Sequence, residues 1–248
     1  MKKLQYIVIA FLMFTCDGEH ANDCFQKTGA IMQQEVAVDP FDKILVNRDI
    51  ELIIKEDATQ KVIIETGKNL LNDVTAKTVD SQLILTDNNT CNFVRDYGVT
   101  KVFVTSPNIT EIRSSTQYDI SSDGVLTYPN LTILSEDFNA PDTFTNGNFR
   151  LQINNDTFRL VFNNLSNCSI SGNTNNLQVT FASGNGRFEG ENLLAQNINL
   201  WHRGTNDMIV NPQQSIQGTI SSVGNVISKN QPPTVNVEAL YKGRLIFE

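Results

Sequence analysis

The sequence predicts an all-β protein whose strands stack as the coils of a parallel β-solenoid. Beyond Thr15, no stretch has the periodicity of a helix longer than two turns, and residues 68–74, the best candidate, are too few to stand alone. Apolar residues alternate with polar ones instead, and their runs recur about every 21 residues. Asparagine, which favours turns, accounts for 29 of the 248 residues.

Length and composition are those of one folded domain. With 40% hydrophobic and 19% charged residues, the chain matches neither a disordered protein nor a polytopic membrane protein. Its formal net charge of −8 repels phosphate backbones, so we expect no nucleic acid partner. The two histidines, His20 and His202, leave little material for His-based metal sites or catalytic triads. We therefore expect no metal and no cofactor.

The segment 1–15 has the pattern of an export signal, because Lys2 and Lys3 precede an apolar run too short to span a bilayer. Cys16 follows directly. This order resembles a bacterial lipoprotein signal, in which the cysteine becomes the lipidated first residue. The alternative is an ordinary secretory signal, with Cys16 an incidental thiol. We divide the chain into a signal peptide (1–15), a lipid-anchored tether with the first strand (16–38) and one β domain (39–248).

Cysteine pairing is the next expectation, because disulfides persist in the oxidising compartments that exported chains reach. If Cys16 carries lipid, three cysteines remain, and three cannot all pair within one chain. Cys24 and Cys91 lie in polar, turn-rich surroundings, whereas Cys168 precedes an alternating pattern. The sequence therefore predicts a Cys24–Cys91 disulfide and a buried, unpaired Cys168. The absence of CxxC and CxxH spacings disfavours a metal site at these cysteines.

The N-terminal part of the domain has the alternation of strands with one buried side. The apolar positions that share a face are Ile44, Val46, Ile50, Leu52 and Ile54, followed by the pairs Val62 with Ile64 and Leu83 with Leu85. Residues 56–60 and 87–89 have turn compositions. We therefore expect hairpin-like pairing to about residue 105.

From residue 109 onward, short apolar runs are separated by Asn, Ser, Gly and Thr. We expect strand starts at Ile109, Leu131, Leu151, Leu177, Ile198 and Ile216. Such spacing is typical of coils that can bury an apolar face only against their neighbours. A β-sandwich with two strands per interval is the alternative. Asparagine favours the solenoid, because Asn side chains in stacked turns can hydrogen-bond along the stack and accept left-handed backbone.

The C-terminal segment, residues 231–247, differs from this pattern of short apolar runs between polar residues, because it contains two prolines followed by a further apolar run. An open last coil would present unpaired backbone to solvent. We therefore expect a return strand that caps the stack.

Two motifs are candidates for binding. The glycine cluster at residues 183–190 could cradle phosphate, but such loops need a helix after them. Weaker copies at residues 203–207 and 222–226 favour a recurring turn between strands instead. Trp201, His202 and Arg203 form a candidate sugar- or partner-binding spot, with a packing role for the tryptophan as the alternative.

Pairs of carboxylates are candidate catalytic groups, because β-solenoids include polysaccharide lyases and glycoside hydrolases. Hydrolysis needs two carboxyl groups about 5 to 10 Å apart. Three pairs could supply them: Asp119 with Asp123, Asp137 with Asp142, and Glu189 with Glu191. Each pair lies in or beside a predicted turn, where Asp is common without chemistry. Residues 114–149 also contain no Lys or Arg that could act as a lyase base.

Residues 39–44 (DPFDKI) lead into residues 50–54 (IELII), and Ser-Gly-Asn-type turns follow. With the closing segment 241–247 (YKGRLIF), this order resembles the putative auto-transporter adhesin, head GIN domain family, over most of residues 39–248. The sequence departs from the family at Trp201-His202-Arg203-Gly204, where a small residue is expected before the glycine. The resemblance implies a right-handed parallel β-solenoid, export in a Gram-negative bacterium and, for many members, a lipid anchor. It supplies no catalytic residues.

Together these observations predict a non-enzymatic lipoprotein of the outer membrane, facing the periplasm or the cell surface. Its expected partners are the membrane, through the anchor, and a glycan or a surface protein, as for an adhesin. Two alternatives stay open: a polysaccharide-active lyase or hydrolase on the same fold, and a purely structural envelope protein.

Overall fold

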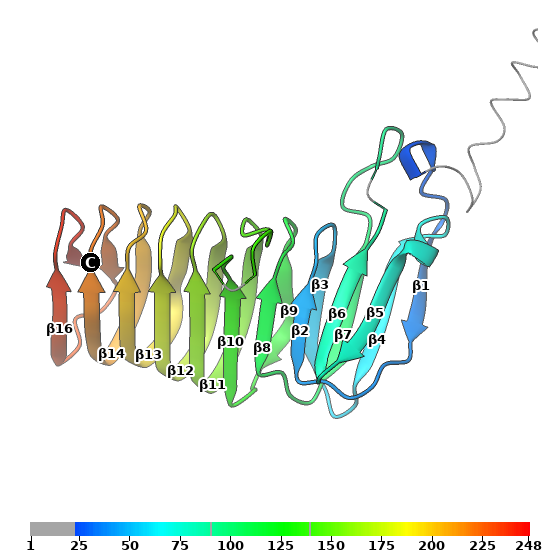
Figure 1. Ribbon diagram of the computed structural model, residues 1–248. Coiled ribbons are helices and arrows are strands. Elements are labelled where there is room, and N and C mark those ends of the chain that lie inside the picture. Colours follow the sequence, from blue (N-terminus) through cyan, green and yellow to red (C-terminus); the bar gives the residue numbers. More distant parts are fainter. Residues whose placement is uncertain (1–22, 90, 139) are drawn as a thin grey trace, which may run out of the picture.

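The computed structural model describes residues 23–89, 91–138 and 140–248 and has an all-β fold. Its strands form one 17-stranded sheet, which winds into a long stack of coils (Figure 1). Within the described residues, helix is limited to two short 3-10 turns, η1 (Asp23–Phe25) and η2 (Leu71–Asp73). The second lies inside the only stretch for which the sequence suggested a helix. The predicted signal peptide, Cys16 and His20 lie outside the described residues.

The strands fall into two groups along the chain. The N-terminal group is β1 (Ile31–Val36), β2 (Lys43–Val46), β3 (Glu51–Glu56), β4 (Lys61–Gly67), β5 (Val74–Val79), β6 (Gln82–Asp87) and β7 (Lys101–Ser106). The later group is β8 (Glu111–Ser114), β9 (Ile120–Leu126), β10 (Asn130–Ser135), β11 (Asn148–Phe162), β12 (Asn167–Phe181), β13 (Arg187–His202), β14 (Met208–Ile220), β15 (Val226–Ser228), β16 (Thr234–Ala239) and β17 (Leu245–Phe247).

Four long strands, β11 to β14, form the regular part of the stack. The first half of β11 pairs with β9 and its second half with β10, so the strand passes from one wall of the stack to the next. Neighbouring coils pair in parallel. The register places Asn148 opposite Asn167 and Phe188 opposite Met208, in each case one coil further along the chain. This repeat agrees with the spacing of the apolar runs.

Inward-facing side chains form columns that run through the coils. One buried column contains Leu131, Phe158, Leu177, Ile198 and Ile216, each opposite the next. Four of these residues are predicted strand starts, but Leu177, Ile198 and Ile216 lie in the second halves of β12, β13 and β14. The assignment of Leu151 to the same series is wrong, because Leu151 lies on the preceding wall, opposite Ile170. Each long strand has two apolar stretches, one for each wall, and the spacing alone did not separate them.

The N-terminal strands are mostly not paired as hairpins. β2 pairs in parallel with β6 and β8, and β3 pairs in parallel with β7 and β9. Among the described strands, antiparallel pairs join β5 to β6 and β4 to both β1 and β7. The hairpin expectation therefore describes β5–β6 but is wrong for β2 and β3. The first coil of the chain is inserted between two coils that come later in the sequence.

The C-terminal segment continues the stack rather than returning over it. β16 pairs in parallel with β14, and β17 pairs in parallel with β15. Val235, Tyr241 and Ile246 are exposed on this last coil. The expected capping strand is therefore wrong: residues 234–247 form one more coil, and no described strand pairs with its outer edge.

The turns between coils also repeat. The first part of the glycine cluster, residues 183–186, lies in the turn from β12 to β13, and residues 187–190 begin β13. Thr205 N donates a hydrogen bond to Gly184 O of the coil before it (2.8 Å). Asparagine side chains link coils, as when Asn167 Nδ2 donates to Asn148 Oδ1 (3.1 Å). The expectation that asparagine accepts left-handed backbone is wrong for the described residues. Their positive-φ residues other than glycine are Asp49, Asp80, Ser81 and Asp142.

Glycine is required where two coils approach closely, as at Gly172. Gly172 has φ +113°, and a Cβ at this position would lie 1.9 Å from Ile153 O of the neighbouring coil. We expect Gly172→Ala to lower the free energy of unfolding by about 3 kcal/mol or more, measured by chemical denaturation. Gly124→Ala is the matched control, because Gly124 also has positive φ (+92°) but no atom lies within 4 Å of the added Cβ. It should cost only about 1 kcal/mol, and equal losses would contradict the close-contact explanation.

Candidate binding face and disulfide-linked tip

One wall of the stack presents a row of uncharged polar side chains to solvent. We define the amide face as the nine outward residues of β12, β13 and β14 on this wall: Asn176, Gln178, Thr180, Asn197, Asn199, Trp201, Ser215, Gln217 and Thr219. None of them is charged, although the whole chain has a net charge of −8. A shallow groove of about 300 Å³ runs over six of these residues.

The side-chain amides at the centre of this face are available to a ligand. Gln178 lies opposite Asn199, and Asn199 lies opposite Gln217. All three residues are exposed, and their side chains have no hydrogen-bond partner among the described residues. Adjacent strands lie about 4.8 Å apart, so this row offers alternating donors and acceptors at a regular spacing.

Trp201, the only tryptophan of the chain, stands on the amide face between Thr180 and Thr219. Its side chain is 43% exposed. The guanidinium carbon of Arg203 lies 5.4 Å from the centroid of the indole ring, a cation–π contact. The structure therefore brings Trp201 and Arg203 together at the surface.

His202 points the other way, because successive residues of a strand face opposite sides. It is fully buried, and its ring contacts Phe181 edge-on, with centroids 5.6 Å apart. Gly204 N donates a hydrogen bond to His202 Nδ1 (3.3 Å), while Nε2 has no partner among the described residues. His202 is a core residue in this structure and cannot contact a ligand on the amide face.

A second surface feature lies at the N-terminal end of the stack. The long connection between β6 and β7 rises beyond the other turns, beside η1 (Figure 1). The Cys24–Cys91 disulfide joins these segments across a sequence separation of 67 residues, the same pair that the sequence predicts. On the chain-entropy model, closing such a loop stabilises the fold by about 4 kcal/mol. We call Asp23–Phe25 and residues 91–97 together the disulfide-linked tip.

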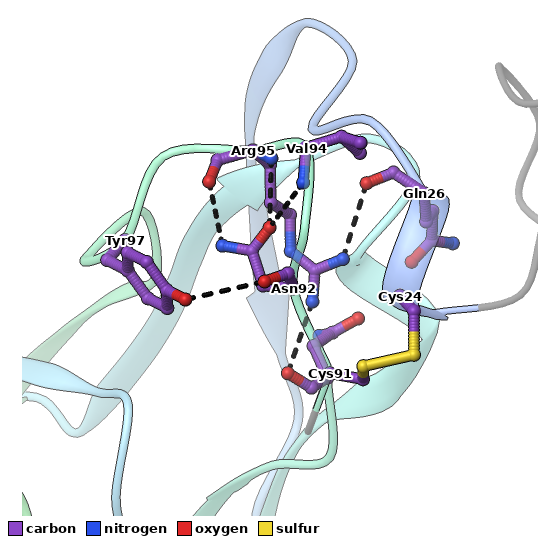
Figure 2. Close-up of a disulfide and its surroundings, with 8 residues drawn as sticks. Cys24, Gln26, Cys91, Asn92, Val94, Arg95 and Tyr97 are labelled. Carbon is purple, nitrogen blue, oxygen red and sulfur yellow. Dashed lines mark hydrogen bonds between the residues drawn. A yellow bond between two sulfur atoms is a disulfide. The ribbon is translucent and has the colours of Figure 1, made fainter.

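Hydrogen bonds hold the tip in shape (Figure 2). The Arg95 guanidinium donates to Gln26 O (3.3 Å) and to Asn89 O (3.1 Å), which ties the two segments together beside the disulfide. Asn92 Oδ1 accepts from the backbone N–H groups of Val94 (3.2 Å) and Arg95 (2.9 Å). Phe93 N donates to Cys24 O (2.9 Å). The backbone N–H groups of Phe93, Val94 and Arg95 are therefore bonded within the tip.

The cavity beneath the tip is small. Its volume is about 130 Å³, and Asp49, Asp87 and Tyr97 are among its lining residues. Asp87 accepts hydrogen bonds from Thr100 Oγ1 (2.7 Å) and from Asn89, and Asp49 accepts one from Gln117 (2.6 Å). Ligand pockets usually measure about 300 Å³ or more, so this cavity is less suited to a sugar than the amide face.

The sequence and its fold can be compared with known proteins. The model of the putative auto-transporter adhesin, head GIN domain family matches residues 40–232. The chain belongs to this family. A search of curated proteins found no match.

Solved structures share the fold of this head GIN domain. A putative adhesin from Bacteroides fragilis superposes with a TM-score of 0.78 at 18% identity, covering 90% of this chain and 99% of its own. A putative adhesin from Parabacteroides distasonis gives 0.64 at 15% identity, covering 90% and 99%. A putative lipid binding protein from the same species gives 0.60 at 13% identity, covering 89% and 98%.

One member of each candidate catalytic pair of the head GIN domain is engaged in a structural contact. Asp119 forms an ion pair with Arg150 (2.9 Å), and Glu189 forms one with Arg187 (3.0 Å). Asp137 accepts a hydrogen bond from the Asn163 side chain. Among the described residues, no three His, Cys, Asp or Glu side chains come together as a metal site. The contacts of Asp119 and Asp137 join neighbouring coils or turns, whereas Arg187 and Glu189 lie on the same strand, β13.

Sequence reasoning missed two parts of the site. The ladder of Gln178, Asn199 and Gln217 was not recognised, although these residues alternate with the apolar positions that did predict the strands. The apolar tip was also missed. Its signal was available in Phe93, Val94 and Tyr97, three large apolar side chains within a polar segment that has no strand alternation.

The buried His202 makes stability depend on pH. Burial lowers the pKa of His202 below its ordinary value, and the Asn206 backbone and the Asp207 charge oppose this shift without cancelling it. Below about pH 6.5 the unfolded chain therefore binds a proton that the folded state binds less readily, and stability falls as pH falls. We expect this residue to contribute at most about 1.4 kcal/mol per pH unit. Denaturation curves between pH 7.5 and 5.5 measure it.

His202→Leu is the control for this pH dependence. The variant should lose part of the fall in stability toward pH 5.5, whatever its stability at pH 7.5. Curves that remain parallel to those of the native protein over the whole range would show that His202 is not the responsible group.

Proposed function

We propose that this protein is a non-enzymatic, lipid-anchored adhesin of a Gram-negative outer membrane, and that it binds glycan through the amide face. The observation that carries the proposal is an uncharged row of unpartnered amides beside an exposed tryptophan. Side-chain amides hydrogen-bond to sugar hydroxyl groups, and an indole ring packs against the apolar face of a sugar. Membership of an adhesin family supports a binding role.

The proposed organisation of the chain is a cleaved signal peptide (1–15), a tether anchored through lipid on Cys16 (16–38) and a head GIN domain (39–248). In the part of the chain that the structure describes, no helix has the length and apolar character needed to cross a membrane. We also infer that the coils wind to the right, because nearly all crossovers between parallel strands do so. The domain would face either the periplasm or the cell surface.

A glycan array probed with the purified protein, followed by calorimetry on the best ligand, tests the proposed function. We expect Trp201→Ala to weaken binding at least about tenfold, because an exposed tryptophan within a binding face supplies much of the contact energy.

Leu194→Ala is the matched control for the glycan experiment. Leu194 lies on the same strand and is also 43% exposed, but it lies outside the amide face. Binding should survive in this variant. Glycan binding that Trp201→Ala leaves intact would refute the site, and cleavage of a polysaccharide by the purified protein would refute the non-enzymatic assignment.

Lipid attachment can be tested separately from binding. In cells fed radioactive palmitate, we expect the native protein to incorporate label and Cys16→Ser to incorporate none, because the thiol is the attachment point. Cys168→Ala is the control, since Cys168 is buried and unpaired, and it should remain labelled. Equal labelling of the native protein and Cys16→Ser would contradict the anchor.

A further inference from the structure

We propose that the disulfide-linked tip inserts its apolar side chains into the interfacial region of the lipid bilayer, as a second contact beside the lipid anchor. This inference rests on the proposed anchor at Cys16. The occupant is a bilayer surface rather than a protein, and the argument comes from the exposure, chemistry, charge and position of the tip.

The tip exposes four large apolar side chains. Phe93 is 73% exposed and Tyr97 is 76% exposed, while Phe25 and Val94 are each 51% exposed. The rings of Phe25 and Phe93 lie 5.7 Å apart, so residues from two distant segments form one patch. Holding these groups in water is unfavourable, and such patches mark interaction sites.

The chemistry of the patch suits a membrane interface. Phenylalanine and valine can enter the boundary between headgroups and acyl chains, and tyrosine prefers that depth because its ring is apolar and its hydroxyl is polar. The backbone N–H groups of Val94 and Arg95 already donate to Asn92 Oδ1. They would therefore not lose hydrogen bonds to water on entering a less polar medium.

Charge and position favour the same partner. The charged residues of the tip are Asp23, Arg95 and Asp96, a net charge of −1, so an anionic surface repels the tip far less than the rest of this acidic chain. Only eight residue steps separate Cys16 from Cys24, and an extended chain of that length spans at most about 28 Å. Because the disulfide joins Cys24 to Cys91, a lipid on Cys16 keeps the patch close to the bilayer.

A fluorescent reporter at the tip tests this contact. The reporter is the Trp201→Phe, Phe93→Trp double variant, reconstituted into vesicles of zwitterionic lipid with or without bromine atoms on the acyl chains. We expect bromine to reduce its fluorescence about twofold, as for an indole at the interface. The native protein is the control, because its only tryptophan lies on the amide face. Bromine on the acyl chains should leave its fluorescence unchanged. An unquenched reporter on protein that floats with the vesicles would overturn the proposal.

A second form of the experiment separates the tip from the anchor. Protein that carries no lipid is coupled through the Cys16 thiol to a maleimide lipid, which reproduces the tether whether or not a cell attaches one. Cys24 and Cys91 are bonded and Cys168 is fully buried, so Cys16 is the reactive thiol. Quenching in this form supports the tip contact even if palmitate labelling fails. Absence of quenching refutes the tip contact even if labelling succeeds.

Discussion

The in-register stacking of coils is the constraint on which the rest of the structure depends. A single coil has too little surface to bury its own apolar face, so it is stable only when its neighbours cover it. Phe162 and Phe181 show the consequence, since their rings stack at 5.7 Å with an angle of 8° between them. Parallel backbone pairing and these internal columns require the same register. A residue is therefore accommodated only if it fits the equivalent residue one coil before and after it.

The same constraint creates the candidate binding face. When Leu177, Ile198 and Ile216 align inside the stack, strand alternation aligns Gln178, Asn199 and Gln217 outside it. The ladder of amides is therefore a consequence of the packing of the core. A continuous polar row of this kind can bind an extended, repetitive ligand along its length, which a compact pocket cannot do.

The regular part of the fold could be predicted from sequence, because both of its signals are local. Alternation revealed the strands, and the spacing from Leu177 to Ile198 to Ile216 gave the repeat. The failures occurred where the information is not local. The insertion of β2 and β3 between later coils depends on pairings between distant parts of the sequence, as between Ile44 and both Leu83 and Ile112. The two prolines and the renewed apolar run of residues 231–247 predicted a cap, although the register of these residues extends the stack.

The candidate site, like the fold, could be predicted only where its signals are local in the sequence. Trp201 was identified because a lone tryptophan beside a glycine turn is visible in sequence. Alternation along β13 could also have shown that Trp201 and His202 face opposite sides. The tip could not be derived in this way, because its shape depends on the Cys24–Cys91 bond and on Arg95 contacts between segments far apart in the chain.

The two surface features are compatible with one orientation of the protein. Six strand steps separate β6, next to the tip, from β13, which carries Trp201. At about 4.8 Å per step, the amide face lies about 29 Å along the stack from the tip. The acidic stack is repelled by an anionic bilayer over roughly 8 to 10 Å, whereas the tip carries little net charge. Contact through the tip alone therefore lets the stack point away from the membrane. Trp201 and the amides would then be accessible to a glycan that does not belong to the membrane that the proposed lipid anchor would enter.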